Sequence, residues 1–557
     1  MNKEDKALKK QFCLRLSLFL AVLLLLNTAV PAVLAEEDEL LLMFKYPVNE
    51  QGEAAVNDVS FDEGWGVDDQ HRVFYEIFVG SFSDSDGDGI GDLRGIINRM
   101  DYLNDGDPQS GLSLGVEGIW LTPIFASPSY HKYDVTDYYT VDPQFGTNED
   151  FRELAQLCHE RGVRVILDMP INHTGSKNRW FRNFLNAHLM NSPDNIWYDF
   201  YTWLGADDAV PAGRHFARAS GQNLRYEANF SDDMPELNFD NPRVYDTVLD
   251  VARHWLDMGA DGFRFDAAKY LYLNDHARNL EFWTRYLNDL RAIKPDLYTV
   301  AEVWDGEGIT DMYLPAINCF NFATSQTSGL IAETAHAGDA NRYAAYLERT
   351  LGRIHTINPD AMNIPFIANH DTDRAAGYLT TASGQMQVAA NLYLLSPGSP
   401  FIYYGEEIGL RGSRGGANTD ATRRLAMVWG DGDTIQDPPG STYNKQTDFT
   451  VQKQKSRSDS PLTYYKRLIM IRKAHHEIAR GELTALSFSD TKAGGYLCTW
   501  QGRSVAVLHN TTQSTAKLIL PENMKVRMCE WIGMGEASLD GSTVTLDGQT
   551  SVILQVE

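Results

Sequence analysis

The hydrophobic positions of the chain form short apolar runs that alternate with longer amphipathic segments from residue 73 to residue 480. Apolar runs of about four to eight residues are typical of buried strands, and apolar positions spaced by about three or four residues are typical of helices. Eight strands that alternate with helices predict an α/β fold, a closed (β/α)8 TIM barrel. The runs predict strands at Val73–Val79, Gly118–Leu121, Arg164–Asp168, Ala260–Asp266, Leu297–Glu302, Cys319–Phe322, Asn363–Ala368 and Phe401–Tyr404.

Two segments have clear helical periodicity. Asn148–Arg161 predicts a helix that ends at Gly162, since glycine commonly terminates helices. Pro461–Arg480 predicts a single helix that closes the barrel, which is therefore expected to span residues 71–482. Beyond it, short alternating segments are separated by turn signals, which predicts a C-terminal antiparallel β-sandwich domain at 483–557.

One connection between predicted strands is too long for a simple crossover. The ends of the third and fourth strands, Asp168 and Asp266, are 266 − 168 = 98 residues apart. Because a βαβ unit needs about 30 residues or more, roughly 60 residues are additional. We expect them to form an inserted subdomain at about Gly175–Asp240, at the carboxyl end of the strands.

The N-terminal region does not share the alternation. Basic residues precede the apolar run Leu16–Leu26, and Val33–Ala35 offers small side chains at a cleavage position, so residues 1–35 are predicted to be a signal peptide. The run is short for a membrane span, which favours cleavage after Ala35 and secretion over an uncleaved anchor. Residues 36–70 are acidic and lack periodicity, and we expect a flexible leader.

The net charge limits the expected binding partners, and the cysteine spacing limits the expected metal sites and disulfides. The formal net charge of −26 makes nucleic acid and anionic lipid surfaces poor partners, and we expect a monomer that does not associate with membranes once the signal is removed. Cys158, Cys319, Cys498 and Cys529 show no metal-ligand spacing. Cys498 and Cys529 both lie in the C-terminal region, where they could form a disulfide or be two buried free thiols.

Three acidic residues stand at the ends of predicted strands: Asp266, Glu302 and Asp371. Carboxylates are seldom left in apolar surroundings without a partner or a task, and the carboxyl ends of barrel strands converge on one face. A group of carboxylates around one bond suits glycoside hydrolysis, which uses a nucleophile, an acid/base and a stabiliser of a cationic sugar. Arg264 lies two residues before Asp266, on the same side of the strand, where its charge is expected to keep Asp266 ionised. In isolation, these two residues could form only a structural ion pair.

Four motifs resemble the four sequence regions of the α-amylase family of glycoside hydrolases and occur in the family's order. They are DMPINH at Asp168–His173, GFRFDAAKY at Gly262–Tyr270, AEVW at Ala301–Trp304 and FIANHD at Phe366–Asp371. The resemblance covers roughly residues 71–557. It implies that the barrel, the insertion and the C-terminal β-domain correspond to the family's three domains.

The resemblance also implies a role for each acid. Asp266 would be the nucleophile that forms a β-glucosyl ester, Glu302 would be the acid/base, and Asp371 would hold sugar hydroxyls and favour the distorted ring. Such a retaining pair needs carboxyl groups about 5 Å apart, which neighbouring strands can supply. Asp168 would organise the site. Substrate contacts are implied for Tyr133, His173, Arg264, His370 and Arg424.

Two of these substrate contacts leave an alternative open. Tyr133 resembles the tyrosine that stacks under the cleaved sugar, but it could equally be a core tyrosine. Arg424 resembles an arginine that contacts the same sugar in oligo-1,6-glucosidases, and its neighbour Arg423 could take that place. The two histidines would donate hydrogen bonds to sugar hydroxyls, because each falls on a motif position.

The segment DSDGDGIGD, at residues 84–92, has the spacing of a calcium loop, although position twelve is Gly95 rather than glutamate. It resembles the calcium loop that follows the first barrel strand in many relatives; the alternative is a solvated acidic turn. A second calcium site of the family would use Asn172, but Tyr270 replaces the histidine that completes it. The predicted Ca²⁺ ligands are Asp84, Asp86, Asp88, Ile90 and Asp92.

Further motifs narrow the activity. MPELN, at Met234–Asn238, resembles the fifth region of a group intermediate between oligo-1,6-glucosidases and neopullulanases, and Ala267 after the nucleophile resembles enzymes that act on α-1,4 bonds. We expect an endo-acting α-amylase. The alternatives are a 4-α-glucanotransferase, an exo-acting α-glucosidase and, as a non-enzyme, an inactive membrane-anchored transporter subunit, which the intact acids disfavour.

Overall fold

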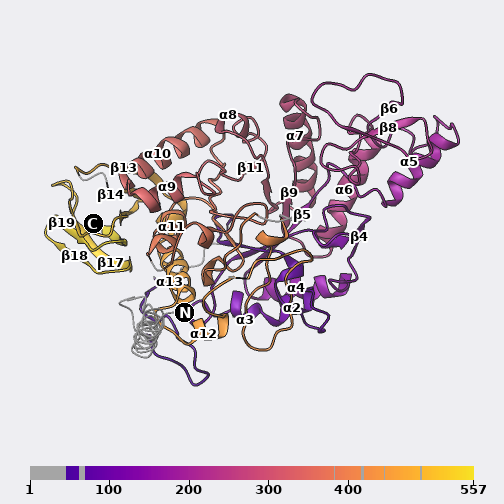
Figure 1. Cartoon of the computed structure of the whole chain (residues 1–557). Coiled ribbons are helices and arrows are strands. Elements are labelled where there is room, and N and C mark those ends of the chain that lie inside the picture. The colour runs from indigo at the N-terminus through magenta and orange to yellow at the C-terminus, as the bar shows by residue number, and fades with distance from the viewer. Residues whose placement is uncertain (1–45, 62–68, 382, 415–419, 445, 490–491) are drawn as a thin grey trace, which may run out of the picture. The chain divides into compact units, whose positions relative to one another are not determined.

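The protein is described by a computed structural model, which covers residues 46–61, 69–381, 383–414, 420–444, 446–489 and 492–557. Within these ranges, seven parallel strands form the central sheet in the order β11-β10-β9-β5-β2-β1-β12 (Figure 1). The strands are β1 Phe74–Ile77, β2 Gly118–Leu121, β5 Arg164–Met169, β9 Gly262–Phe265, β10 Tyr298–Ala301, β11 Asn318–Cys319 and β12 Phe401–Tyr403.

The seventh barrel strand in chain order is replaced by isolated bridges. Phe320 bridges Ile364 and Phe366 bridges Phe401, both in parallel, so this segment joins the two edges of the sheet. The strand predicted at Asn363–Ala368 is interrupted because Pro365 has no N–H to donate to a ladder. The carbonyl oxygen of Pro365 still accepts a hydrogen bond from the N–H of Phe401 at 3.0 Å. The predicted (β/α)8 barrel is thereby confirmed.

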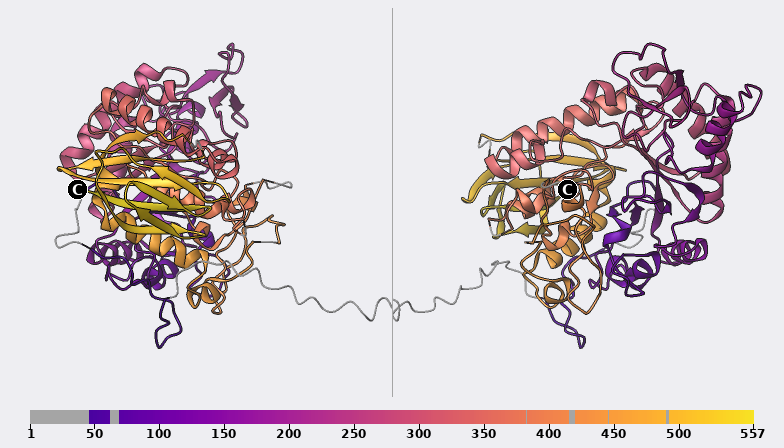
Figure 2. Two further views of the ribbon diagram at one scale, coloured as in Figure 1. Left: turned by 90° about the vertical axis from the view of Figure 1, so that its left-hand side faces the viewer. Right: turned by 45° about the vertical axis from the view of Figure 1, so that its right-hand side comes forward.

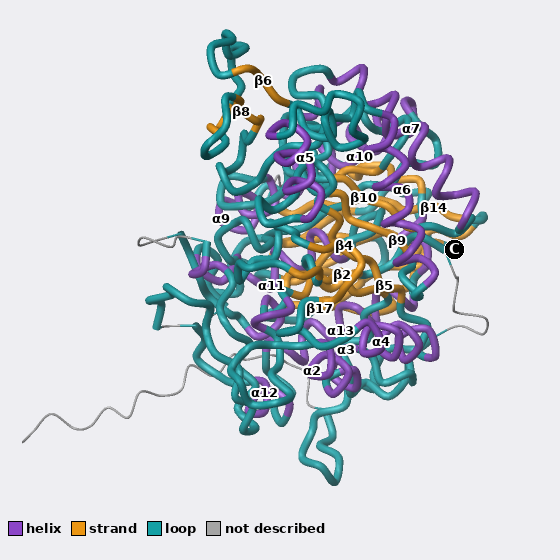
Figure 3. The backbone as a smooth tube through the Cα atoms, turned by 90° about the vertical axis from the view of Figure 1, so that its right-hand side faces the viewer, coloured by secondary structure: helices purple, strands orange, loops and turns teal. Residues whose placement is uncertain are grey.

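The barrel interior is filled by large side chains from successive strands. Phe74 stacks on Phe401 with ring centroids 4.8 Å apart, and Trp120 and Phe320 lie beside them. Helices surround the strands (Figure 3). They are α2 Leu93–Asn98, α3 Met100–Leu103, α4 Asn148–Glu160, α6 Pro242–Asp257, α7 His276–Ile293, α8 Glu307–Thr310, α9 Leu330–Ala337, α10 Ala340–Ile357, α11 Gln385–Leu394, α12 Val451–Lys455, α13 Pro461–Ala474 and α14 His476–Arg480.

Of the two helices predicted with defined ends, one agrees closely with the structure and the other does not. α4 begins with a capping box in which the Thr147 side chain and Asp150 each accept from the other's backbone, and it ends one residue before the predicted Arg161. The single helix predicted at Pro461–Arg480 is wrong, because His475 leaves helical conformation at φ −115° and ψ 86° and separates α13 from α14.

Two additional chain segments extend from the carboxyl ends of the strands. After β2, a hairpin pairs β3 Phe125–Ala126 with β4 Asp137–Val141. After β5, the predicted insertion holds α5 Arg179–Leu189 and an antiparallel sheet in the order β6-β8-β7, which extends away from the central strands in Figure 3. The strands of this sheet are β6 Trp203–Gly205, β7 Phe216–Arg218 and β8 Leu224–Glu227.

Two antiparallel sheets make up the C-terminal region (Figure 2, yellow). Leu508, Leu518, Val544 and Leu554 belong to one buried cluster between them, as expected of a β-sandwich. Their orders are β13-β14-β15-β20-β17 and β16-β19-β18. The strands are β13 Glu482–Leu486, β14 Ala493–Trp500, β15 Arg503–Asn510, β16 Ala516–Ile519, β17 Val526–Gly533, β18 Ala537–Asp540, β19 Thr543–Leu546 and β20 Thr550–Val556.

The two C-terminal cysteines are separate. Among the described residues, no disulfide joins Cys498 to Cys529. Cys498 is buried in β14, whereas Cys529 is partly exposed on β17, so the description of two buried thiols holds only for the first.

The described part of the leader predicted at residues 36–70, residues 46–61 and 69–70, contacts distant segments of the chain. The N–H of Ala54 donates to the Lys455 carbonyl at 2.7 Å, and Asp58 pairs with Arg467 at 2.9 Å. The predicted signal peptide lies outside the described residues. Within them, no helix is both long and apolar enough to cross a bilayer.

Candidate active site

Strand register brings the predicted acids together. Asp168 on β5 is the direct neighbour of Arg264 on β9, and Phe265 pairs with Ala301 of β10. The next residues, Asp266 and Glu302, therefore leave their strands side by side at the carboxyl end of the barrel. The strand-end pattern in the sequence is thus sufficient to gather these groups.

Arg264 joins three carboxylates. One of its terminal nitrogens lies 2.8 Å from Asp168 and 2.7 Å from Asp266, and the other lies 3.1 Å from Glu302. The guanidinium group is 1% exposed and sits 5.2 Å from the centre of the Trp120 ring. A buried cation with this many acceptors fixes the relative positions of the carboxylates more firmly than a surface ion pair would.

Burial and charge shift the pKa values of Asp266 and Glu302. Burial raises the pKa of Asp266 to about 6 and that of Glu302 to about 7, and in both cases the charge of Arg264 opposes the rise. Arg264 therefore limits the rise in the Asp266 pKa without reversing it. Near neutral pH Asp266 is mostly ionised while a large fraction of Glu302 carries its proton, which is the division that acid/base chemistry needs.

Asp371 belongs to a second network. His370 Nε2 lies 3.1 Å from Asp371 and its Nδ1 lies 2.5 Å from Glu76, while Arg424 contacts the other oxygen of Asp371 at 2.8 Å. Burial alone would raise the pKa of Asp371, but the charges of His370 and Arg424 outweigh it and lower the pKa far below its usual range. Burial would lower the pKa of His370, but Asp371 and Glu76 raise it to about 10. Asp371 is thus a fixed anion.

Glu76 was not predicted from the sequence, although its signal was present. It is an acid inside the apolar run FYEIF of β1 and is 1% exposed. The reasoning that selected the three strand-end acids applies to it equally. Because it contacts His370 rather than the cavity, it positions that histidine.

Tyr133 and His173 both reach the cavity. The Tyr133 hydroxyl donates to Asp168 at 2.8 Å and lies 2.7 Å from His370 Nε2, and its ring stacks on His370 with centroids 5.6 Å apart. Burial lowers the pKa of His173 to about 4, and a hydrogen bond with the Tyr133 backbone opposes this shift. A neutral, buried imidazole on a cavity wall can bond a polar ligand.

A cavity of about 540 Å³ opens over these groups. Arg264 and His370 lie beneath it rather than on its wall, so they act through the carboxylates that they hold. Arg423 does not line it either and instead donates to the Asp371 backbone carbonyl at 2.6 Å. The residues on the wall include Tyr133, His173, Phe230, Asp266, Tyr270, Glu302, Trp304, Asp371 and Arg424.

Exposed aromatic rings at the cavity were not predicted individually. Phe230, from the insertion, is 46% exposed and its ring centre lies 5.5 Å from that of His173. Trp304 is 40% exposed and stacks on Phe322 with centroids 4.9 Å apart. Large aromatics are seldom left in solvent, so two of them beside buried acids indicate a surface for flat apolar ligand faces.

The predicted calcium ligands are only partly assembled. Carboxylate oxygens of Asp84, Asp86 and Asp88 lie within 4.8 Å of one another, which suits a hard cation. Asp92, predicted as a further ligand, instead caps α2 by accepting from the N–H of Gly95 at 2.6 Å. The N–H of Ile90 donates to Asp88 at 2.7 Å. The donor set therefore fits calcium at the three converging aspartates, with Asp92 engaged by the helix.

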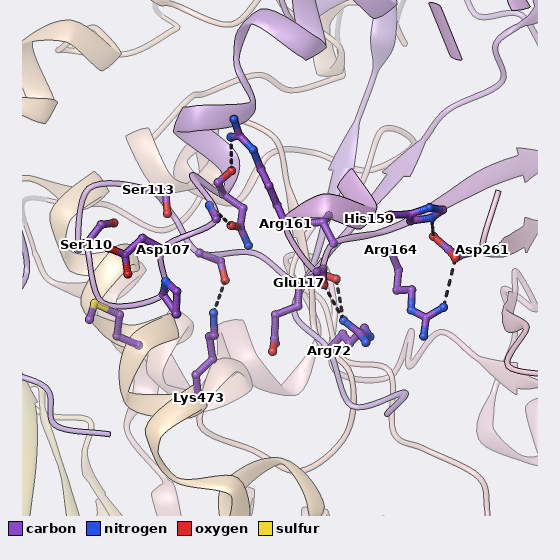
Figure 4. Close-up of a pocket in the computed structure, with 18 of the residues that line it drawn as sticks. Arg72, Asp107, Ser110, Ser113, Glu117, His159, Arg161, Arg164, Asp261 and Lys473 are labelled. Carbon is purple, nitrogen blue, oxygen red and sulfur yellow. Dashed lines mark hydrogen bonds and ion pairs between the residues drawn. The ribbon is translucent and has the colours of Figure 1, made fainter. Parts of the chain in front are cut away.

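A second cavity, of about 550 Å³, lies near the amino ends of the strands (Figure 4). Its charged groups are paired within the wall: Arg164 contacts Asp261 at 3.2 Å, and Lys473 donates to the Gly115 carbonyl at 3.3 Å. Interactions at this end of a barrel generally serve stability. We therefore assign the chemistry to the cavity at the carboxyl ends.

Comparisons with known proteins show the family of the chain. The profile of the family described as "Alpha amylase, catalytic domain" matches residues 76–481. "Alpha-amylase 3" of Dictyoglomus thermophilum is 34% identical over 472 residues, covering 81% of this chain and 86% of its own length. "4-alpha-glucanotransferase" of Thermotoga neapolitana is 30% identical over 452 residues, covering 79% and 95%. The solved structure "Eubacterium rectale Amy13B" has a TM-score of 0.82 at 32% identity and covers 90% of this chain and 97% of that chain.

Proposed function

The chain belongs to the alpha-amylase family of glycoside hydrolases, and we propose that it is a retaining enzyme that hydrolyses α-1,4 bonds inside starch and related α-glucans. One observation carries the proposal: Asp266 and Glu302 contact the same buried guanidinium group and open into one cavity. Retaining hydrolysis needs two carboxyl groups that lie close together beside the glycosidic bond that is cleaved.

In the first step, the proton of Glu302 moves to the glycosidic oxygen as the bond from that oxygen to the anomeric carbon breaks. The carboxylate of Asp266 forms a bond to the same carbon, which gives a β-glucosyl ester. The raised pKa of Glu302, about 7, supports its role as the proton donor, and the lower value of Asp266, about 6, supports its role as the nucleophile.

In the second step, the Glu302 carboxylate takes a proton from water, and the oxygen of that water attacks the anomeric carbon. The bond to Asp266 breaks and the sugar leaves with its original configuration. Asp371 remains anionic throughout, since His370 and Arg424 hold its pKa low. It stabilises positive charge on the sugar and accepts hydrogen bonds from its hydroxyls.

The walls of the cavity support a glucan substrate. His173 offers a neutral imidazole to sugar hydroxyls, and Tyr133 offers its ring face to the sugar. Phe230 and Trp304 provide exposed aromatic faces on which further glucose units can stack.

A second activity, 4-α-glucanotransfer, is supported by the relative of that name at 30% identity. It shares the first step, and a sugar hydroxyl replaces water in the second. Incubation with maltotriose separates the two activities, because hydrolysis gives glucose and maltose whereas transfer gives longer oligosaccharides.

We further propose that Asp84, Asp86 and Asp88 bind calcium with the Ile90 carbonyl, and that the chain is exported with cleavage after Ala35. The convergence of the three aspartates supports the first proposal. The basic start and apolar run of the leader support the second. N-terminal sequencing of protein from culture medium tests export: it should begin at Glu36, and recovery only from membranes with Met1 intact would contradict cleavage.

The proposed function is tested by a time course on soluble starch. An endo-acting hydrolase should abolish iodine staining well before reducing ends reach their final level. A parallel loss of stain and gain of reducing ends would indicate exo-action, and accumulation of long oligosaccharides from maltotriose would indicate a transferase.

A further inference from the structure

His475 lies where the last helices of the barrel meet the C-terminal sheet. It separates α13 from α14, is 7% exposed, and places Nε2 at 2.5 Å from Oε2 of Glu530 on β17. Glu530 is 8% exposed. His475, the residue that interrupts the predicted helix, therefore contacts β17, which is the edge strand of the C-terminal sheet.

A β-bulge adds a third ligand-type group to this pair. Met528 pairs with Leu554 and Glu530 pairs with Ile553, so Cys529 is an extra residue in β17. Consecutive side chains on a regular strand point to opposite faces, but a bulge re-aims one of them. Here the Cys529 sulfur, a His475 ring nitrogen and a Glu530 oxygen all lie within 4.8 Å of one another.

We propose that His475, Cys529 and Glu530 form a zinc-binding site. Imidazole nitrogen, thiolate sulfur and carboxylate oxygen are the protein ligands of zinc, with bonds of about 2.0–2.3 Å. Tetrahedral geometry at those bond lengths places ligand atoms about 3.3–3.5 Å apart, so side-chain rotation within the present cluster suffices. A nitrogen and sulfur ligand set disfavours calcium and magnesium, which select oxygen.

The burial pattern also suits a metal. The nitrogen and oxygen ligands are buried, while Cys529 is partly exposed, which leaves access from solvent and room for a water as fourth ligand. A buried ion pair between His475 and Glu530 alone would not need Cys529 beside it. Zinc binds thiolate sulfur and neutral imidazole nitrogen, so its affinity for such a site depends on pH.

The proposed zinc would connect the α13–α14 junction to β17. None of its ligands lines the catalytic cavity. Its expected effect is on stability: a ligand that binds only the folded state raises the unfolding temperature as its free concentration rises. The reaction at Asp266 and Glu302 should be unaffected.

Cobalt titration tests the site in the full-length protein, stripped of metal, kept reduced and supplied with excess calcium. The wild-type protein should develop a thiolate-to-cobalt charge-transfer band in the near ultraviolet, which zinc then abolishes. Cys529→Ser should lose the band and the zinc-dependent rise in unfolding temperature. Cys498→Ser is the matched control and should keep the band, because Cys498 is a buried thiol outside the cluster.

His475→Gln provides a second variant and should also lose the band. Each variant is first checked for a cooperative unfolding transition, so that loss of the band is not loss of the fold. Absence of the band in wild-type protein, or its persistence in Cys529→Ser, would overturn the proposal and leave a plain ion pair between His475 and Glu530.

Discussion

Oε1 of Glu76, on the first barrel strand, lies 2.5 Å from Nδ1 of His370, in the loop that follows the seventh strand position in chain order. This contact helps to raise the pKa of His370 to about 10, although burial opposes it. A protonated His370 in turn holds Asp371 as an anion. The charge on the catalytic face is therefore set partly by a residue that does not line the cavity.

Glu76→Gln removes that charge and keeps the shape of the side chain. We expect kcat on starch to fall by about tenfold to a hundredfold, because Asp371 loses electrostatic support. The pKa of His370 should fall, so the remaining activity should decline further at alkaline pH. Glu406→Gln is the matched control, a buried glutamate held by Tyr393 and Tyr465 outside the cavity. Equal loss in both variants, or no loss in Glu76→Gln, would contradict this role.

The pH dependence of kcat/KM follows from the two reacting carboxyl groups. Asp266 must be ionised, so the rate should fall as the pH drops through about 6. Glu302 must be protonated, so the rate should fall as the pH rises through about 7. The two apparent pKa values of this pH profile describe the interacting pair of carboxyl groups rather than either residue alone. A rate that stays constant far above neutral pH would contradict the assignment of Glu302 as the acid.

Glu302→Gln removes the proton donor. Its activity on starch should be almost lost, whereas a glucosyl fluoride should still react in the first step, because fluoride leaves without protonation. Azide should then raise turnover, since a small anion attacks the glucosyl-enzyme without a general base. Measurement of fluoride release with and without azide checks both expectations. Failure of both would show that Glu302 is not the acid/base.

Calcium should stabilise the protein through Asp84, Asp86 and Asp88. At a free concentration about a hundredfold above Kd, binding to the folded state alone contributes about 2.7 kcal/mol. Chelation should lower the unfolding temperature, and Asp86→Ala with Asp88→Ala should remove the difference. Asp105→Ala with Asp107→Ala, in another acidic turn, is the control and should keep it. If calcium does not change the unfolding temperature of metal-free wild-type protein, the loop is a solvated acidic turn that does not bind calcium.

The sequence was sufficient to predict that the strand-end acids lie close together, because the strand pattern and the geometry of a barrel both lead to that result. Asp266 and Glu302 follow apolar runs, and neighbouring parallel strands must bring their ends to one face. The predicted limits of the second strand, Gly118–Leu121, agree with the structure for the same reason. Asp92 shows the limit of spacing alone, because the backbone of α2 competes for its carboxylate.

Other features depend on contacts that sequence distance does not reveal. His475 interrupts a periodic helix and meets Glu530, which is 55 residues away in the chain. The exposed Phe230 and Trp304 reach one cavity from different elements. The packing of residues 46–61 depends on distant backbone partners rather than on any local pattern.

The central claim is that Asp266 becomes covalently glycosylated during turnover. Glu302→Gln incubated with a maltosyl fluoride and quenched in acid should accumulate the ester, because its hydrolysis lacks a general base. Peptide mass spectrometry should then find a maltosyl addition on the peptide that contains Asp266, and Asp266→Asn in the same background should abolish it. A maltosyl addition on the peptide of Asp371, or rapid fluoride release with no addition on any peptide, would contradict the account.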